Sequence, residues 1–183
     1  MRHILTLSLL MLILSTSACS SQPPAPIVQT VDDSSGESLT HSREPLRMVA
    51  LRPALSRVGK DYLFVAPVSV SGRGTPQDYL WFAFGSTLDR RLAGTPIPAV
   101  KTIVLFVDEM PMTFDLAAWP ELSSSQPFEL DVEHYMSFGA KITASQLRRI
   151  ASANALRAYV TDGANRSPTY ELSDGSFVAW SAF

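Results

Sequence analysis

The chain has 183 residues, of which 46% are hydrophobic and 17% are charged, and this size and composition fit one globular domain. The formal charge of −2 gives no electrostatic basis for binding nucleic acid. A single cysteine cannot form an internal disulfide, and three scattered histidines give little support to a zinc site. We therefore expect neither a metal nor a cofactor.

The first nineteen residues have the layout of an export signal. Arg2 gives a positive start, residues 4–14 are apolar but too few to span a bilayer comfortably, and small residues then lead into Cys19. The ending Ser17-Ala18-Cys19 resembles the lipobox of bacterial lipoproteins, in which the cysteine is acylated and becomes the new N-terminus.

This resemblance implies a signal peptide over residues 1–18 and lipidation of Cys19. Ser20 stands where inner-membrane lipoproteins carry Asp, which implies the outer membrane, facing the periplasm. Each buried acyl CH₂ contributes about 0.8 kcal/mol, so acyl chains hold a domain at a membrane without a spanning helix. The alternative is an ordinary secretory peptide cut after Ala18, which would leave a thiol at the new N-terminus.

Residues 20–45 are rich in Ser, Pro, Asp and Glu and contain no aromatic residue. Such a segment buries too little apolar surface to offset its ordering entropy. We therefore expect a lipidated cysteine and flexible tether over residues 19–45, with His41 as a solvated linker residue. A single globular domain should follow over residues 46–183.

From Leu46 onward, short apolar runs are separated by Gly, Pro, Asp and Ser clusters, which is typical of a β-rich domain. We expect a weak strand at 47–52 and a hairpin of strands 62–70 and 78–85. The Gly-Arg-Gly loop of this hairpin leads into a strand and not a helix, so it is not interpreted as a phosphate site. Residues 101–107 are apolar at both parities, which predicts a central strand covered on both faces.

Residues 128–136 alternate apolar with acidic residues and predict a half-buried strand with an acidic outer face. One helix is predicted near 144–153, because Thr143 and Gln146 have capping-box spacing before an apolar stripe. Further strands are expected at 156–161, 169–172 and 177–183. No strand–helix–strand alternation is present, so we predict a mainly β, antiparallel sandwich-like or α+β domain with one short helix.

No residue set predicts catalysis. A catalytic histidine needs a nucleophile and an orienting carboxylate, and the sequence assigns neither to His134, which we interpret as a core or edge residue. The acidic pairs Asp108–Glu109 and Asp131–Glu133 lack the glycine-turned loop of a calcium site. We interpret them as turn residues and as a solvated face.

Tyr79 and Trp81 share one face of the strand at 78–85, while the large apolar residues 80, 82 and 84 share the other. Either the helix covers Tyr79 and Trp81, which the frequent burial of such residues favours, or they form an exposed patch of interface anchors. Arg90 and Arg91 follow the strand. They would either add a cationic patch or simply remain locally paired and solvated.

The expected function is a lipid-anchored, non-catalytic domain of the cell envelope that binds a protein partner in an assembly, secretion or accessory role. The candidate partner-binding residues are Tyr79, Trp81, Arg90 and Arg91. One alternative is an envelope hydrolase that uses His134 with a carboxylate or a serine. Another is a small-ligand carrier, which would enclose an apolar cavity.

Overall fold

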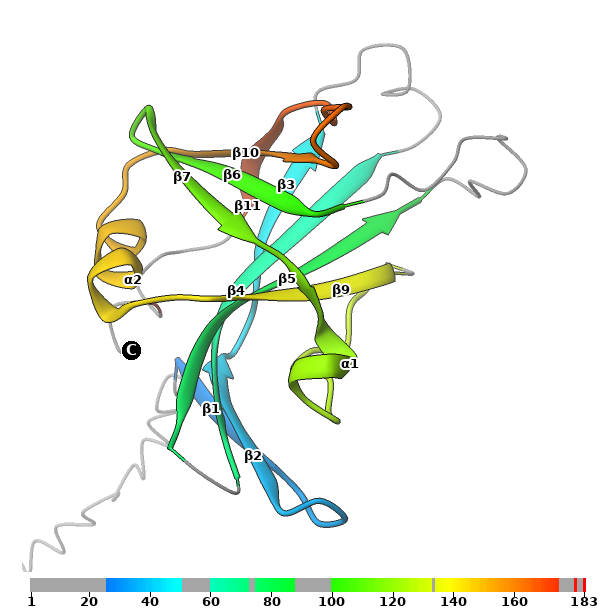
Figure 1. The fold of residues 1–183 in the computed structure, drawn as a ribbon, viewed down its shortest axis with the longest axis vertical. Helices are drawn as coiled ribbons and strands as arrows, with labels where there is room; N and C mark the ends of the chain where they lie inside the picture. The colour runs from blue at the N-terminus through cyan, green and yellow to red at the C-terminus, as the bar shows by residue number, and fades with distance from the viewer. Residues whose placement is uncertain are drawn as a thin grey trace, which may run out of the picture.

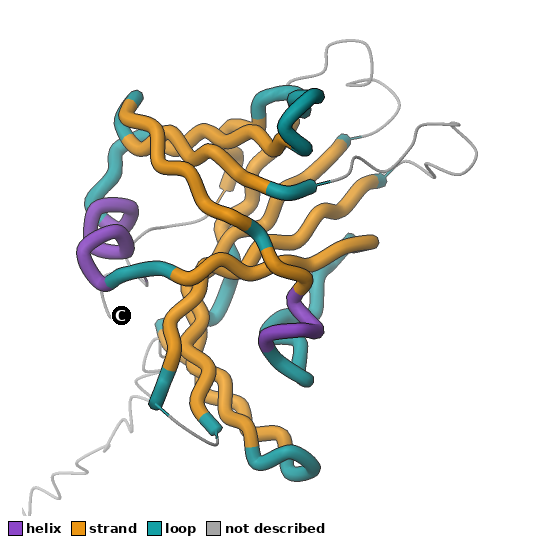
Figure 2. The backbone as a smooth tube through the Cα atoms, in the orientation of Figure 1, coloured by secondary structure: helices purple, strands orange, loops and turns teal. Residues whose placement is uncertain are grey.

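In the computed structural model, the described residues are 26–50, 60–72, 75–87, 100–132, 134–174, 180 and 183, and most of them lie in antiparallel strands (Figures 1 and 2). The strands are β1 (Ile27–Asp32), β2 (Glu37–Ser42), β3 (Leu46–Ala50), β4 (Asp61–Ser71), β5 (Gln77–Ser86), β6 (Thr102–Val107), β7 (Met110–Asp115), β8 (Ala117–Ala118), β9 (His134–Lys141), β10 (Leu156–Thr161) and β11 (Tyr170–Asp174). The helices are α1 (Trp119–Leu122) and α2 (Ala144–Ala151). The predicted strand at 177–183 falls mostly outside the described residues.

Eleven strands of the described chain belong to one sheet, in the order β7-β6-β10-β11-β3-β4-β5-β9-β8, with β2 also paired to β4 and β1 to β2. β7 pairs with β6, and β8 pairs with β9. Because β7 and β8 are separated only by Leu116, the two ends of this order are consecutive in the chain. The sheet therefore curls until it is nearly closed (Figure 1), and the predicted mainly antiparallel β domain is confirmed.

The inner face of the sheet carries the larger hydrophobic core, which we call the inner cluster. Leu80, Phe82 and Phe84 of β5 are at most 1% exposed and belong to this cluster. On β6, Ile103 points into the same cluster and Val104, at the opposite parity, is also buried, as predicted for a strand covered on both faces.

The predicted helix is present as α2. The Thr143 hydroxyl accepts a hydrogen bond from the Gln146 N–H at 3.3 Å, and the Gln146 side chain accepts one from the Thr143 N–H at 2.9 Å, which completes the capping box. Leu147 and Ile150 are buried in the inner cluster. The helix therefore covers the inner core and not the face that carries Tyr79 and Trp81.

The outer face of β4 and β5 carries a second hydrophobic core, which we call the outer cluster. The segment 119–132, which we call the covering segment, lies over this face and contributes Trp119 and Phe128 to the cluster. α1 packs closely on β9, because a Cβ built on Gly139 would lie 2.5 Å from Leu122 Cδ1 and 2.9 Å from Trp119 Cε3. The outer cluster consists of Leu39, Phe64, Ala66, Val68, Tyr79, Trp81, Ala83, Trp119 and Phe128.

The prediction of a flexible tether over residues 19–45 is wrong for residues 27–42, which form the β1–β2 hairpin. Its turn is stabilised by the Asp32 carboxylate, which accepts the Ser34 N–H at 2.8 Å, and by Gly36 at φ +68°. β2 pairs with the far half of β4. The polar composition of these residues does not predict a hairpin. The hairpin forms because β2 obtains backbone hydrogen bonds from the edge of the longer strand β4.

The hairpin also binds the covering segment. The hydroxyls of Ser124 and Ser125 donate to Asp32 Oδ2 at 3.2 and 3.1 Å, and the Ser123 hydroxyl donates to the Glu37 carboxylate. Hydrogen bonds from Ser34 and Ser35 of the turn, and a smaller contribution from Ser125, hold the pKa of Asp32 well below its usual value. The two elements that cover the outer face are therefore joined to each other.

The predicted strand at 128–136 is wrong over its first half. β9 begins at His134, and residues 128–132 have no ladder partner among the described residues. The expected alternation of burial is present, with Phe128 buried and Glu129 and Asp131 exposed. An extended segment that lies across a sheet face shows this period of two without strand pairing.

Candidate functional site

Phe128 fixes the start of the extended segment 128–132 on the outer cluster. Its ring lies 4.7 Å from the His41 ring, edge to face, and 5.0 Å from the Trp81 ring, measured between centroids. His41 comes from β2 and Trp81 from β5, so Phe128 joins the hairpin to the main sheet. Such aromatic contacts add about 0.5–1.5 kcal/mol each to the burial of the rings.

His41 is 4% exposed, so its prediction as a solvated linker residue is wrong. Its Nδ1 lies 2.8 Å from the carbonyl oxygen of Ser42, and burial lowers the pKa of the imidazole. Burial therefore favours the neutral ring, and Nδ1 is the donor because a carbonyl oxygen can only accept. Its Nε2, like Trp81 Nε1, has no hydrogen-bond partner among the described residues, so the outer face contains two buried polar atoms that are unsatisfied there.

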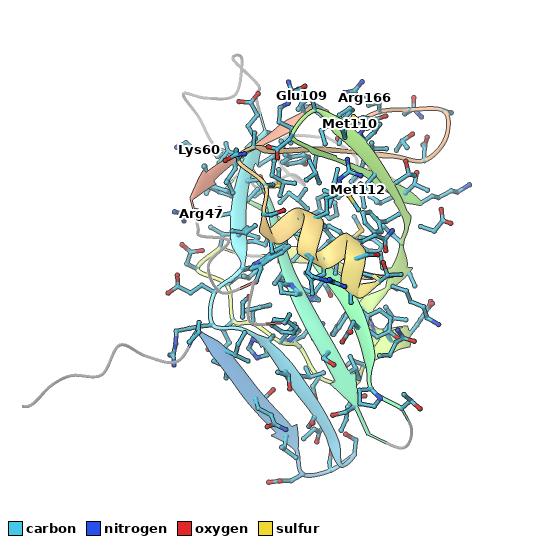
Figure 3. All side chains as sticks on the ribbon, turned by 90° about the vertical axis from the view of Figure 1, so that its left-hand side faces the viewer. Arg47, Lys60, Glu109, Met110, Met112 and Arg166 are labelled. Atoms are coloured by element: carbon cyan, nitrogen blue, oxygen red, sulfur yellow. The ribbon has the colours of Figure 1, made fainter. Side chains whose placement is uncertain are left out.

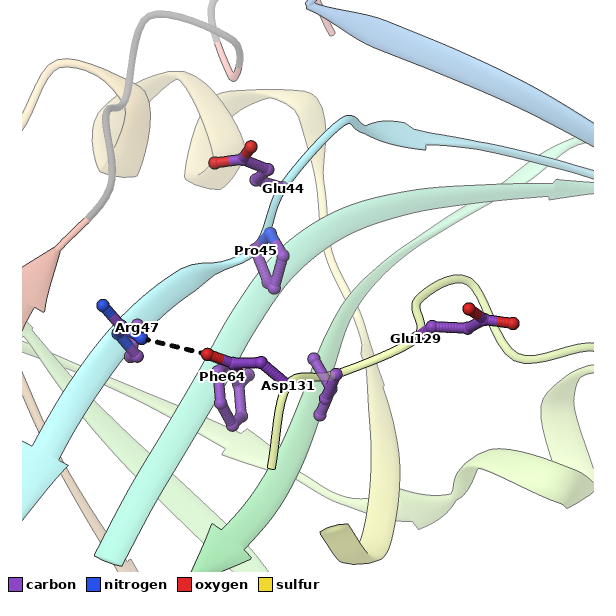
Figure 4. A pocket seen from close by; sticks show the side chains of 7 residues that line it. Glu44, Pro45, Arg47, Phe64, Glu129 and Asp131 are labelled. Atoms are coloured by element: carbon purple, nitrogen blue, oxygen red, sulfur yellow. Dashed lines mark hydrogen bonds and ion pairs between the residues drawn. The ribbon is translucent and has the colours of Figure 1, made fainter. Parts of the chain in front are cut away.

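Asp131 ties the other end of the extended segment to β3. Its Oδ2 lies 3.4 Å from Nη1 of Arg47, and the two side chains are 67% and 35% exposed (Figure 4). A pair this exposed contributes at most about 1 kcal/mol. Its effect is to place the segment beside β3 and β4, with the residues between Phe128 and Asp131 along a groove.

This groove, which we call the acidic groove, is open to solvent and has a volume of about 320 Å³. Phe64 of β4 forms its apolar floor, Glu44 lies on the β3 side, and Glu129 lies on the side of the covering segment (Figure 4). Among the described lining residues, three carboxylates outnumber the one guanidinium, that of Arg47. The lining residues are Glu44, Pro45, Arg47, Phe64, Glu129, Leu130 and Asp131.

The described residues of the acidic groove are of types that bind charged and apolar groups. Among them there is no Ser, Thr, Cys or His side chain to act as a nucleophile or an imidazole base. In the described part of the chain, no group of three or more His, Cys, Asp and Glu side chains is placed to hold a metal ion. Carboxylates around an apolar floor match a cationic group on an apolar side chain or backbone.

A second groove of about 420 Å³ lies between β7 and β9. Asp115 and Lys141 carry opposite charges there, and the Gln146 side chain is engaged in the α2 cap. This groove has no excess of one charge and is the weaker candidate. Its lining residues are Tyr79, Thr113, Phe114, Asp115, Ala117, Leu122, Gly139, Lys141 and Gln146.

The exposed aromatic patch is not formed. Tyr79 is 8% exposed and Trp81 is not exposed, so burial in the core, the favoured interpretation, is confirmed, and the exposure that would support them as partner-binding anchors is absent. The cover comes from Trp119 and Phe128, and not from the predicted helix. Burial raises the pKa of the Tyr79 phenol.

The remaining predicted site residues fall in different places. Cys19, Arg90 and Arg91 lie outside the described residues. The backbone of His134 pairs with Gly85 at a register shift between β5 and β9, and its side chain lies outside what the structure describes. The hydrolase and the small-ligand carrier therefore stay predictions.

The two acidic pairs lie in different parts of the structure as far as it describes them, because Glu133 lies outside the described residues. Asp108 and Glu109 are turn residues, as predicted, and form the β6–β7 turn, in which both have positive φ. Asp108 accepts the backbone N–H groups of Asn154 and Ala155 at 2.9 Å each. Asp131 lines the acidic groove.

Sequence reasoning missed three principal groove residues, Glu44, Arg47 and Phe64. They belong to no motif and meet only because β2 and β3 both run along β4. The one available signal of the groove was the alternation of residues 128–132, which predicted that the acidic residues Glu129 and Asp131 are exposed.

Comparisons with protein-family models, with curated proteins and with solved structures found no match for this chain. None of the helices in the described ranges has the length and apolar character needed to cross a membrane. The fold and site define a mainly β domain with a nearly closed sheet and an acidic, apolar-floored groove on its outer face.

Proposed function

We propose that this protein is a lipid-anchored, non-catalytic domain of the cell envelope that binds a protein partner through the acidic groove. The lipid anchor rests on the lipobox-like sequence at Cys19, and location at the outer membrane rests on Ser20. The observation that carries partner binding is the groove itself, which surrounds the apolar floor at Phe64 with three carboxylates and one guanidinium.

The chemistry of the groove indicates what the partner presents. Glu44 and Glu129 are exposed on its two sides, and both can receive an arginine or lysine of a bound segment. Phe64, Pro45 and Leu130 offer apolar contact between them. A basic residue next to apolar ones, in an extended segment, fits this arrangement and would be attracted over a distance of about 8–10 Å at physiological salt.

The anchor would keep the groove close to the bilayer. Ile27 begins β1 only eight residues after Cys19. At about 3.3–3.6 Å per residue, the intervening chain spans at most about 28 Å. The hairpin shortens the tether expected from composition, so the proposed partner is itself a membrane-bound or membrane-associated envelope protein.

The test is co-purification from detergent-solubilised membranes with a Glu44→Lys/Glu129→Lys variant. We expect the wild type to retain a stoichiometric partner that the double variant loses. Glu121→Lys is the matched control, because Glu121 is exposed on α1 and lines neither groove. Retention of the partner by the double variant, or equal loss in the control, would refute binding at the groove.

The anchor is tested separately by mass spectrometry of the N-terminal peptide from the native protein. The proposal predicts acyl chains on Cys19 and the release of a Cys19→Ser variant from membranes. An unmodified thiol at this position would refute the anchor and leave the groove untouched.

A further inference from the structure

The outer edge of β1 is the feature that the fold leaves unused. Among the described residues, β1 pairs with β2 and with no other strand. The hairpin lies at the end of the molecule opposite Glu109 and Arg166 (Figure 3). Val31 is 60% exposed, more than any other large hydrophobic residue in the described chain.

The register shows which backbone groups point outward. The Arg43 N–H donates to the Pro26 carbonyl at 2.8 Å, which places this pair in the hydrogen-bonded phase of the β1–β2 ladder. Hydrogen-bonded pairs alternate along an antiparallel ladder. Val28 and Thr30 therefore bond to β2, while the N–H and C=O groups of the alternate residues, Ile27, Gln29 and Val31, point away from it.

Residues 27–31 of this edge have none of the features that prevent strands from adding to one another. Protected edges carry lysine, proline, a bulge or an inward charge. β1 reads Ile-Val-Gln-Thr-Val-Asp, contains neither lysine nor proline, and keeps an unbroken register with β2 over all six residues. Four of its residues are β-branched, which favours the extended conformation.

We propose that β1 pairs antiparallel with β1 of a second copy of this chain, about a twofold axis at Gln29. In this register, Gln29 faces Gln29 of the second copy, and Ile27 faces Val31. These are the residues whose backbone groups point outward, so all of them are satisfied in one step. The exposed Val31 side chain is covered by an isoleucine.

Charge also favours a second copy over an unrelated strand. Asp32 is the only charged residue of β1, and the twofold register places it opposite Pro26, so no like charges face each other. The same register pairs Ile27 with Val31 and Gln29 with Gln29, and it places Val28 opposite the β-branched Thr30. The pairing does not depend on the acidic groove, and it leaves the groove residues outside the new interface.

The test measures self-association of the full chain in detergent by sedimentation velocity. Gln29→Lys and Gln29→Glu each place like charges opposite one another at the axis and should weaken dimerisation roughly two- to fivefold. A one-to-one mixture of the two variants should restore it. Thr40→Lys is the matched control, because Thr40 is the β2 neighbour of Gln29 and lies one strand inside the edge.

A proline at position 29 gives a second readout. Gln29→Pro removes an N–H that points outward, so it should abolish the dimer while leaving thermal unfolding of the monomer nearly unchanged. A wild-type chain that stays monomeric would overturn the proposal and make a foreign strand the occupant of the edge. A dimer that is insensitive to every change at Gln29, or a mixture that fails to recover, would also overturn it.

Discussion

The two faces of strands β4 and β5 are buried by different means. The inner face packs against the other strands of the nearly closed sheet and against α2, and β5 contributes only apolar residues to it. The outer face is covered by the β1–β2 hairpin and the covering segment, which are far apart in the sequence. It includes a buried histidine and a buried tryptophan, and Nε2 of His41 and Nε1 of Trp81 find no partner in the described chain. Closure of the sheet therefore forms the inner core. Specific contacts between the hairpin, the covering segment and the sheet form the outer core.

The largest effect expected is from Trp119→Ala, which removes a fully buried ring from the outer cluster. We expect a loss of about 3–5 kcal/mol in the free energy of unfolding, measured with urea, comparable to Phe82→Ala on the inner face. A cost below about 1 kcal/mol would show that the outer face is a surface and not a second core. Trp81→Ala should behave like Trp119→Ala and so reports on folding, not on binding.

Gly139→Ala tests the close approach of α1 to β9. The new methyl group would overlap Leu122 and Trp119, so we expect a loss of about 1–3 kcal/mol. The Leu122→Ala background removes the nearest atom, and the cost of the glycine change should shrink there. Additive costs in the double variant would contradict the packing described for α1.

The sequence predicts the inner face of β4 and β5 better than the outer face. On the inner face, the parity of Leu80, Phe82 and Phe84 and the capping box at Thr143 were readable, because alternation and capping are local properties. Burial of Tyr79 and Trp81 was the favoured interpretation, but their cover was not identified.

The segments that cover the outer face could not be predicted from the sequence, for two physical reasons. Residues 128–132 alternate like a strand, yet they meet a sheet face and not a sheet edge. The hairpin at 27–42 has a linker's composition, and its stability comes from β4 and from Ser124 and Ser125. Its β-branched run and its Asp-Ser-Ser-Gly turn were the signals that an analysis of composition overlooks.

Thr143→Ala is a smaller change confined to the inner side. Loss of the capping box should cost about 1 kcal/mol, measured by thermal unfolding. Thr143→Ser keeps the hydroxyl and should recover most of the stability. Equal losses in both variants would show that the hydroxyl does not cap α2.

The smallest change at neutral pH is expected from His41→Phe, whose effect is on pH dependence. Burial lowers the pKa of His41 in the folded protein, so the unfolded chain binds more protons near its usual pKa of about 6.5. The free energy of unfolding should therefore fall as pH drops below about 6.5, and the variant should lose this part of the slope. The two proteins are otherwise identical, so the difference between their slopes reports on His41. Identical slopes would contradict burial of the imidazole.

The most direct test of partner binding at the outer face is photocrosslinking in intact membranes. A photoreactive residue replaces Glu129 in the acidic groove or, as the control, Glu121 on α1. The account predicts a discrete crosslinked product of higher mass with the probe at position 129 and none at position 121. No product at 129, or the same product from both positions, would contradict the groove as the site of partner binding.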